Sequence, residues 1–108
     1  MNRVVITGAG TINALGHTVA ETMAAMREGR CGIGQLELRD VERLAISIGG
    51  QVRDFEAEGR FNRQQITLYD RFTQFTLFAA KEAIAQSGLV FSGALADRAG
   101  VVLGTAGG

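Results

Sequence analysis

The chain has 108 residues, of which 46% are hydrophobic and 20% are charged, a composition typical of a globular domain rather than of a disordered segment. Eleven Lys and Arg residues balance eleven Asp and Glu residues, so no net charge favours nucleic acid or an anionic membrane as a partner. The single cysteine excludes an internal disulfide, and there is no second Cys or His to build a zinc site.

The N-terminal part predicts a strand, a loop and a helix. Residues 3–7 include three consecutive β-branched side chains, which indicates a strand covered on both faces. After a glycine-containing loop, Thr18 and Glu21 have the spacing of a capping box, in which each side chain binds the backbone N–H of the other residue. We therefore expect a helix over residues 19–28, ended by Gly29.

The middle of the chain is less regular. Residues 30–43 show no clear pattern, whereas residues 44–52 read as a second strand that Gly49 and Gly50 interrupt, as at a bulge or a close approach of backbones. The stretch that follows is polar, and we expect it to lie at the surface with a short helical turn over residues 63–67.

Residues 70–86 predict the clearest helix. Its apolar side chains cover most of the circumference, which indicates a helix buried nearly all round, and Ser87 and Gly88 close it. Four of its residues are small enough to permit close approach by another element: Ala79, Ala80, Ala83 and Ala85.

Residues 99–104 predict a third strand, as apolar as the first. Helices that alternate with strands covered on both faces indicate an α/β protein with a parallel or mixed sheet. A helix buried on all sides needs further layers around it, and the chain stops within a glycine-rich stretch. We therefore expect residues 1–108 to be an incomplete part of a larger domain.

The pair Gly8 and Gly10 raises the question of nucleotide binding. In the fingerprint G-x-G-x-x-G, a helix begins inside the motif and presents its N-terminus to the pyrophosphate. Here Asn13 stands in place of the third glycine, and the capping box starts the helix only at Val19. We favour the alternative that the glycines let the chain turn sharply off a buried strand, and a nucleotide-binding module is the less favoured hypothesis.

Some side chains imitate functional sites. A nucleophilic cysteine needs a base nearby, but His17 lies beyond the other end of the predicted helix, about 15 Å from Cys31. We expect Cys31 to be semi-buried and not catalytic, and His17 to be a loop residue near the helix start. The spacing of Phe72, Phe75 and Phe78 along the long helix indicates core packing rather than a ligand box.

Five pieces of the chain occur in the order found in the β-ketoacyl-acyl carrier protein synthases, the elongating condensing enzymes of fatty acid and polyketide synthesis. These pieces are RVVITGAGTINALG, MREGRCGIG, GGQVRDF, YDRFTQFTLFAAKEAIAQSGL and RAGVVLGTAGG. The similarity covers essentially the whole chain, which resembles the N-terminal part of this family.

The resemblance implies the thiolase-like fold, a layered αβαβα arrangement to whose N-terminal half residues 1–108 would belong. It also implies a homodimer that performs a decarboxylative Claisen condensation. An acyl group is loaded onto a cysteine, malonyl-carrier protein loses CO₂, and the resulting carbanion attacks the thioester. In the family this cysteine and two histidines lie beyond position 108, so the resemblance implies no catalytic residue here; Cys31 matches none of them. It implies no cofactor and no metal.

The resemblance singles out Ala106 as a substrate-binding residue. The family often has a bulky aliphatic residue there that gates the acyl pocket, and the smaller side chain would open the pocket to longer acyl chains. The chain departs from the family before the long helix, where several Lys and Arg residues usually dock the acidic acyl carrier protein. Here Arg60 and Arg63 stand among neutral residues and, with the acids before them, predict a mixed solvated surface.

An alternative on the same fold is a non-catalytic partner subunit that sets chain length. No apolar run approaches the roughly 18 residues of a membrane span, and polar residues and glycines interrupt any leader peptide. We therefore expect a cytoplasmic protein whose partners are acyl carrier protein and the malonyl and acyl thioesters.

Overall fold

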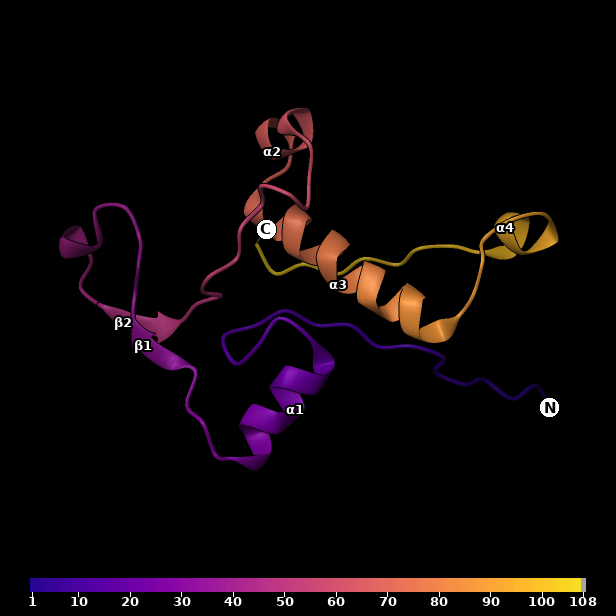
Figure 1. The fold of residues 1–108 in the computed structure, drawn as a ribbon, viewed down its shortest axis with the longest axis horizontal. Helices are drawn as coiled ribbons and strands as arrows, with labels where there is room; N and C mark the ends of the chain where they lie inside the picture. Colours follow the sequence, from indigo (N-terminus) through magenta and orange to yellow (C-terminus); the bar gives the residue numbers. More distant parts are fainter. Residues whose placement is uncertain (108) are drawn as a thin grey trace.

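The computed structural model describes residues 1–107 (Figure 1). A long helix runs through the middle of the view, with the other elements arranged around it. In chain order the elements are α1 Val19–Arg27, β1 Ile33–Gln35, the 3₁₀ helix η1 Val41–Arg43, β2 Ile48–Gly50, α2 Arg63–Leu68, α3 Arg71–Ser87 and α4 Ala94–Arg98.

Helix α1 begins where the local sequence predicts. The Thr18 hydroxyl accepts a hydrogen bond from the backbone N–H of Glu21 at 3.1 Å, and Gly29 follows the helix with a φ of 69°, a conformation that glycine adopts without steric cost. The second half of the predicted capping box is wrong. The Glu21 carboxylate reaches one residue further back and accepts from the backbone N–H of His17 at 2.6 Å.

Strands β1 and β2 form a two-stranded antiparallel sheet in which Ile33 faces Gly50 and Gln35 faces Ile48. The strand predicted over residues 44–52 is confirmed for residues 48–50 only, and the predicted interruption at Gly49 and Gly50 is wrong, because both glycines pair with β1. Its partner β1 was not predicted, since three residues are too short for a period-two pattern to stand out. Beyond the ladder, the Gln51 side chain continues the pairing by binding both the N–H and the C=O of Glu37.

Helices α2 and α3 follow their local signals. Asn62 and Gln65 form a complete capping box at the start of α2, which confirms the short helical turn expected there. The predicted long helix is confirmed as α3, and Gly88 ends it in the left-handed conformation with a φ of 67°. Helix α4 lies between the predicted long helix and the predicted third strand, where the sequence analysis places no helix.

The core lies between α3 and the segment that precedes α2. Phe55 is at its centre, and its ring meets Phe75 at 5.1 Å and Phe78 at 5.5 Å between centroids, both edge to face. The core interpretation of the helix phenylalanines is confirmed for these two, whereas Phe72 is 38% exposed. Other residues of the cluster are Ala57, Phe61, Ile12, Val52, Ile66 and Tyr69.

The strands predicted over residues 3–7 and 99–104 are absent from the described part of the chain. A strand needs a neighbour that binds its backbone N–H and C=O groups, and neither segment pairs with another strand there. Val4 is 94% and Val101 is 92% exposed, so both segments are extended but uncovered. A parallel or mixed sheet with two covered faces is therefore not seen in residues 1–107.

The expectation that α3 is buried nearly all round is also wrong for this structure. Leu77 and Ile84 are exposed, and Gln74 is the one buried residue of α3. One face of α3 packs on the phenylalanine core and the N-terminal segment, while Leu77 and Ile84 remain 37% and 45% exposed.

Candidate functional site

The glycine pair near the N-terminus packs directly on α3. A Cβ atom on Gly8 would lie 2.1 Å from the carbonyl oxygen of Ala83, and one on Gly10 would lie 1.9 Å from that of Ala79. Neither glycine has a positive φ. The favoured interpretation, a sharp turn off a strand, is therefore wrong: the pair permits close contact between two backbones, and the predicted role of the α3 alanines is confirmed at two positions.

The backbone N–H groups beside the glycines are already occupied. Ala9 donates to the side-chain oxygen of Gln86 at 2.7 Å, and Thr11 donates to the Glu82 carboxylate at 3.0 Å. A phosphate would need these amides free and would meet the negative charge of Glu82. The geometry thus argues against the nucleotide-binding hypothesis.

Asn13 organises the turn that follows. Its backbone N–H donates to the carbonyl of Gly16 at 2.9 Å, its side-chain oxygen accepts from Leu15 N–H at 2.8 Å, and its amide nitrogen binds the hydroxyls of Thr11 and Thr22. The residue that breaks the dinucleotide fingerprint is therefore the residue that closes this loop. Asparagine in a short loop is a local signal for such a turn, and sequence reasoning treated it only as a missing glycine.

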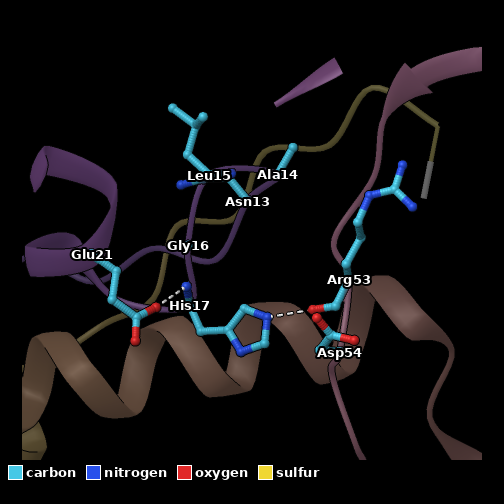
Figure 2. Close-up of a pocket in the computed structure, with 8 residues that line it drawn as sticks. All are labelled: Asn13, Ala14, Leu15, Gly16, His17, Glu21, Arg53 and Asp54. Carbon is cyan, nitrogen blue, oxygen red and sulfur yellow. Dashed lines mark hydrogen bonds between the residues drawn. The ribbon is translucent and has the colours of Figure 1, made fainter. Parts of the chain in front are cut away.

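A hollow of about 400 Å³ opens beside this turn (Figure 2). It lies between the start of α1 and the segment after β2. Its lining is Asn13, Ala14, Leu15, Gly16, His17, Glu21, Arg53 and Asp54.

His17 is the one imidazole of the hollow, and packing fixes it. Its Nε2 lies 2.6 Å from the carbonyl oxygen of Arg53, and because a carbonyl only accepts, Nε2 carries the proton. The ring also meets Phe55 and Phe78 edge-on at 6.2 and 6.5 Å. His17 is a loop residue as predicted, but it joins the loop to the core and does not present Nε2 as a base.

Arg53 connects the hollow to the β hairpin. Its guanidinium turns away from the hollow, pairs with the Glu37 carboxylate at 2.7 Å and donates to the carbonyl of Gln35. The next residue, Asp54, has a φ of 57°, a left-handed conformation that Asp adopts more readily than most residues. The hollow therefore presents the carboxylates of Glu21 and Asp54 without a lysine, serine, threonine or cysteine in its lining.

Cys31 lies outside this hollow and is exposed, so its predicted semi-buried position is wrong. Its sulfur accepts from the backbone N–H of Ile33 at 3.4 Å. The dyad with His17 that the sequence argued against does not form, since the His17 Nε2 is bound to Arg53. Cys31 has no base positioned to activate it within residues 1–107.

Two arginines lie over the core phenylalanines. The guanidinium carbon of Arg60 is 4.8 Å from the centroid of Phe78, and that of Arg71 is 5.1 Å from the centroid of Phe55. Such cation–π contacts stabilise by about 0.5–1 kcal/mol at exposed sites. Arg60 is exposed as predicted, but its guanidinium lies over an aromatic ring rather than extending freely into solvent.

The predicted substrate residue Ala106 is exposed and lies in the irregular stretch after α4. It does not line the hollow around His17. For residues 1–107, no three His, Cys, Asp or Glu side chains gather as metal ligands, and no helix is long and apolar enough to cross a membrane.

The sequence profile described as "Beta-ketoacyl synthase, N-terminal domain" matches residues 1–108. The chain belongs to the beta-ketoacyl synthase family. It is 38% identical over 103 residues to a 3-oxoacyl-[acyl-carrier-protein] synthase 2 of Synechocystis, and 33% identical over 103 residues to the protein of the same name from Staphylococcus aureus. Each match covers 95% of this chain and 25% of the relative.

The resemblance read from the five sequence pieces is thus confirmed. This beta-ketoacyl synthase chain spans about a quarter of the length of the curated relatives it matches. Family membership implies the thiolase-like fold, while the structure of residues 1–107 shows helices and a two-stranded sheet rather than the complete layers.

Proposed function

We propose that the protein is a 3-oxoacyl-[acyl carrier protein] synthase. The observation that carries this proposal is the match of the whole chain to the family, together with relatives that bear this name. In the proposed reaction an enzyme thiolate takes the acyl group from its thioester. Malonyl-carrier protein then loses CO₂, and the carbanion attacks the acyl-enzyme to give a 3-oxoacyl-carrier protein and the free thiol.

The catalytic cysteine and two histidines of this mechanism would lie outside residues 1–108. The geometry of residues 1–107 supports this placement of the catalytic residues. Cys31 is exposed without a base, and the His17 Nε2 donates to a backbone carbonyl. We further infer a cytoplasmic homodimer that acts on acyl carrier protein thioesters.

The test is condensation by the full-length protein. Purified protein is incubated with an acyl-carrier protein and malonyl-carrier protein, and the products are identified by mass spectrometry. Formation of 3-oxoacyl-carrier protein with one CO₂ per condensation is the expected result. Absence of any condensation by a folded protein would contradict the proposal and favour the non-catalytic partner subunit.

We also propose that Ala106 leaves the acyl pocket open to longer chains. The Ala106→Ile variant of the full-length enzyme should then shift the products toward shorter acyl chains, because the larger side chain fills the space. The matched control is Ala106→Gly, which adds no bulk and should keep the chain-length profile. An Ile variant with the original profile would reject this role for Ala106.

A further inference from the structure

One carboxylate on α3 binds two backbone amides that lie eight residues apart. The Glu82 Oε2 accepts from Thr11 N–H at 3.0 Å, and its Oε1 accepts from Val19 N–H at 2.8 Å. Both bonds are part-buried, where a charge-assisted hydrogen bond is stronger than at an open surface. The loop between the two amides therefore starts and ends at the same side chain.

The second of these amides opens a helix. Val19 is the first residue of α1, and the first N–H groups of a helix have no partner within it. The local acceptors serve other amides, because Thr18 binds Glu21 N–H and the Glu21 carboxylate binds His17 N–H. Glu82 therefore acts as a remote cap, and its negative charge lies where the helix dipole favours it.

The spacing along α3 also fits the N-terminal segment. Gln86 binds Ala9 N–H as Glu82 binds Thr11 N–H, so the two backbones run antiparallel. Four helical residues rise about 6 Å, and two residues of extended chain span about 6.6 Å. Alternate amides of the segment thus meet successive turns of α3, and Gly10 removes the side chain that would separate them.

We propose that Glu82 is a positioning residue that fixes the loop 12–18, and with it His17 at the hollow, and that both of its oxygens are needed. This inference rests on contacts within the chain and is independent of the condensation reaction. Its specific signature is that Thr11 and Val19 share one acceptor group, whereas Ala9 depends on a different one.

The test is residue-resolved hydrogen exchange of the full-length protein, read at the amides of Ala9, Thr11 and Val19. In Glu82→Ala, exchange of Thr11 and Val19 should accelerate about 10- to 100-fold, as expected for lost charge-assisted bonds. Exchange of Ala9 should stay unchanged. Unchanged exchange of both Thr11 and Val19 in a folded Glu82→Ala protein would overturn the proposal.

Glu82→Gln tests the two carboxylate oxygens separately, and it replaces the alanine variant if that variant does not fold. A carboxamide has one accepting oxygen and one donating nitrogen, so just one of the two amides, Thr11 or Val19, should accelerate. Uniform acceleration that includes Ala9, or no change at either amide, would overturn the role of the two oxygens. The control is Glu28→Gln, because Glu28 is exposed and pairs only locally with Arg30.

Discussion

A Cβ atom on Gly10 would stand 1.9 Å from the carbonyl oxygen of Ala79, a distance that backbone atoms can relieve only by moving apart. The contact joins the N-terminal segment to the long helix across almost seventy positions of sequence. It explains why the glycine pair is there without any appeal to a bound phosphate.

The Gly10→Ala variant should therefore lower the free energy of unfolding. Overpacking costs about 1–3 kcal/mol, which exceeds the gain of about 0.4–1 kcal/mol from restricting the unfolded chain. Urea denaturation of the full-length protein measures the difference. The matched control is Gly50→Ala, whose added Cβ would meet Ile33 and Ala14 at ordinary contact distances of 3.6 and 3.7 Å. Equal stability of the two variants would contradict the close contact.

The ring of Phe55 holds the core together, and truncating it should be costly. Phe55 is 6% exposed and contacts two further phenylalanine rings, so Phe55→Ala should lose about 3–5 kcal/mol of unfolding free energy. Phe72→Ala provides the comparison, since Phe72 lies on α3 and is 38% exposed. Thermal and urea denaturation should show a much smaller loss for Phe72→Ala, and the reverse order would place the core elsewhere.

His17 offers a test of hydrogen bonding against packing. In His17→Leu the part-buried carbonyl of Arg53 keeps an apolar neighbour but loses its donor, which costs at most about 3 kcal/mol, the upper value for a buried acceptor. Gln carries a nitrogen donor near the place of Nε2, so His17→Gln should be the more stable of the two variants. If denaturation ranks His17→Leu above His17→Gln, the ring contacts with Phe55 and Phe78 matter more than the bond to Arg53.

Cys31 should be dispensable for the proposed condensation. It is exposed and lacks a base within residues 1–107, so Cys31→Ala in the full-length protein should keep kcat/KM for acyl and malonyl thioesters. The steady-state rate of product formation checks this. A tenfold fall, equivalent to about 1.4 kcal/mol of transition-state stabilisation, would assign Cys31 to the catalytic machinery.

Helices α1, α2 and α3 could be predicted because their signals are local. Thr18 lies three residues from Glu21, Gly88 directly follows α3, and Gly29 comes one residue after the C-cap of α1. The segments at residues 3–7 and 99–104 have strand-forming side chains, but a strand exists only when another strand binds its backbone. The composition of each segment shows that it prefers the strand conformation. It does not show whether another strand is present to pair with it.

The site depends on contacts that no local pattern contains. The bond from Val19 to Glu82 spans 63 positions, and the bond from His17 to Arg53 spans 36. The sequence identified His17 as a loop residue and the α3 alanines as small, which proved useful. It could not show that Asn13, Arg53 and Asp54 would meet around one hollow, because contacts between distant segments, such as the bond from His17 to Arg53, bring them together.

The match between the N-terminal segment and α3 has a consequence for how this region can change. Because Ala9 and Thr11 meet Gln86 and Glu82 one helical turn apart, an inserted or deleted residue between either pair would carry one amide out of reach of its acceptor. The contact would tolerate replacing Gln86 or Glu82 by another side chain that accepts a hydrogen bond. It would not tolerate a change in the number of residues between them. Length, rather than composition, is what this contact constrains.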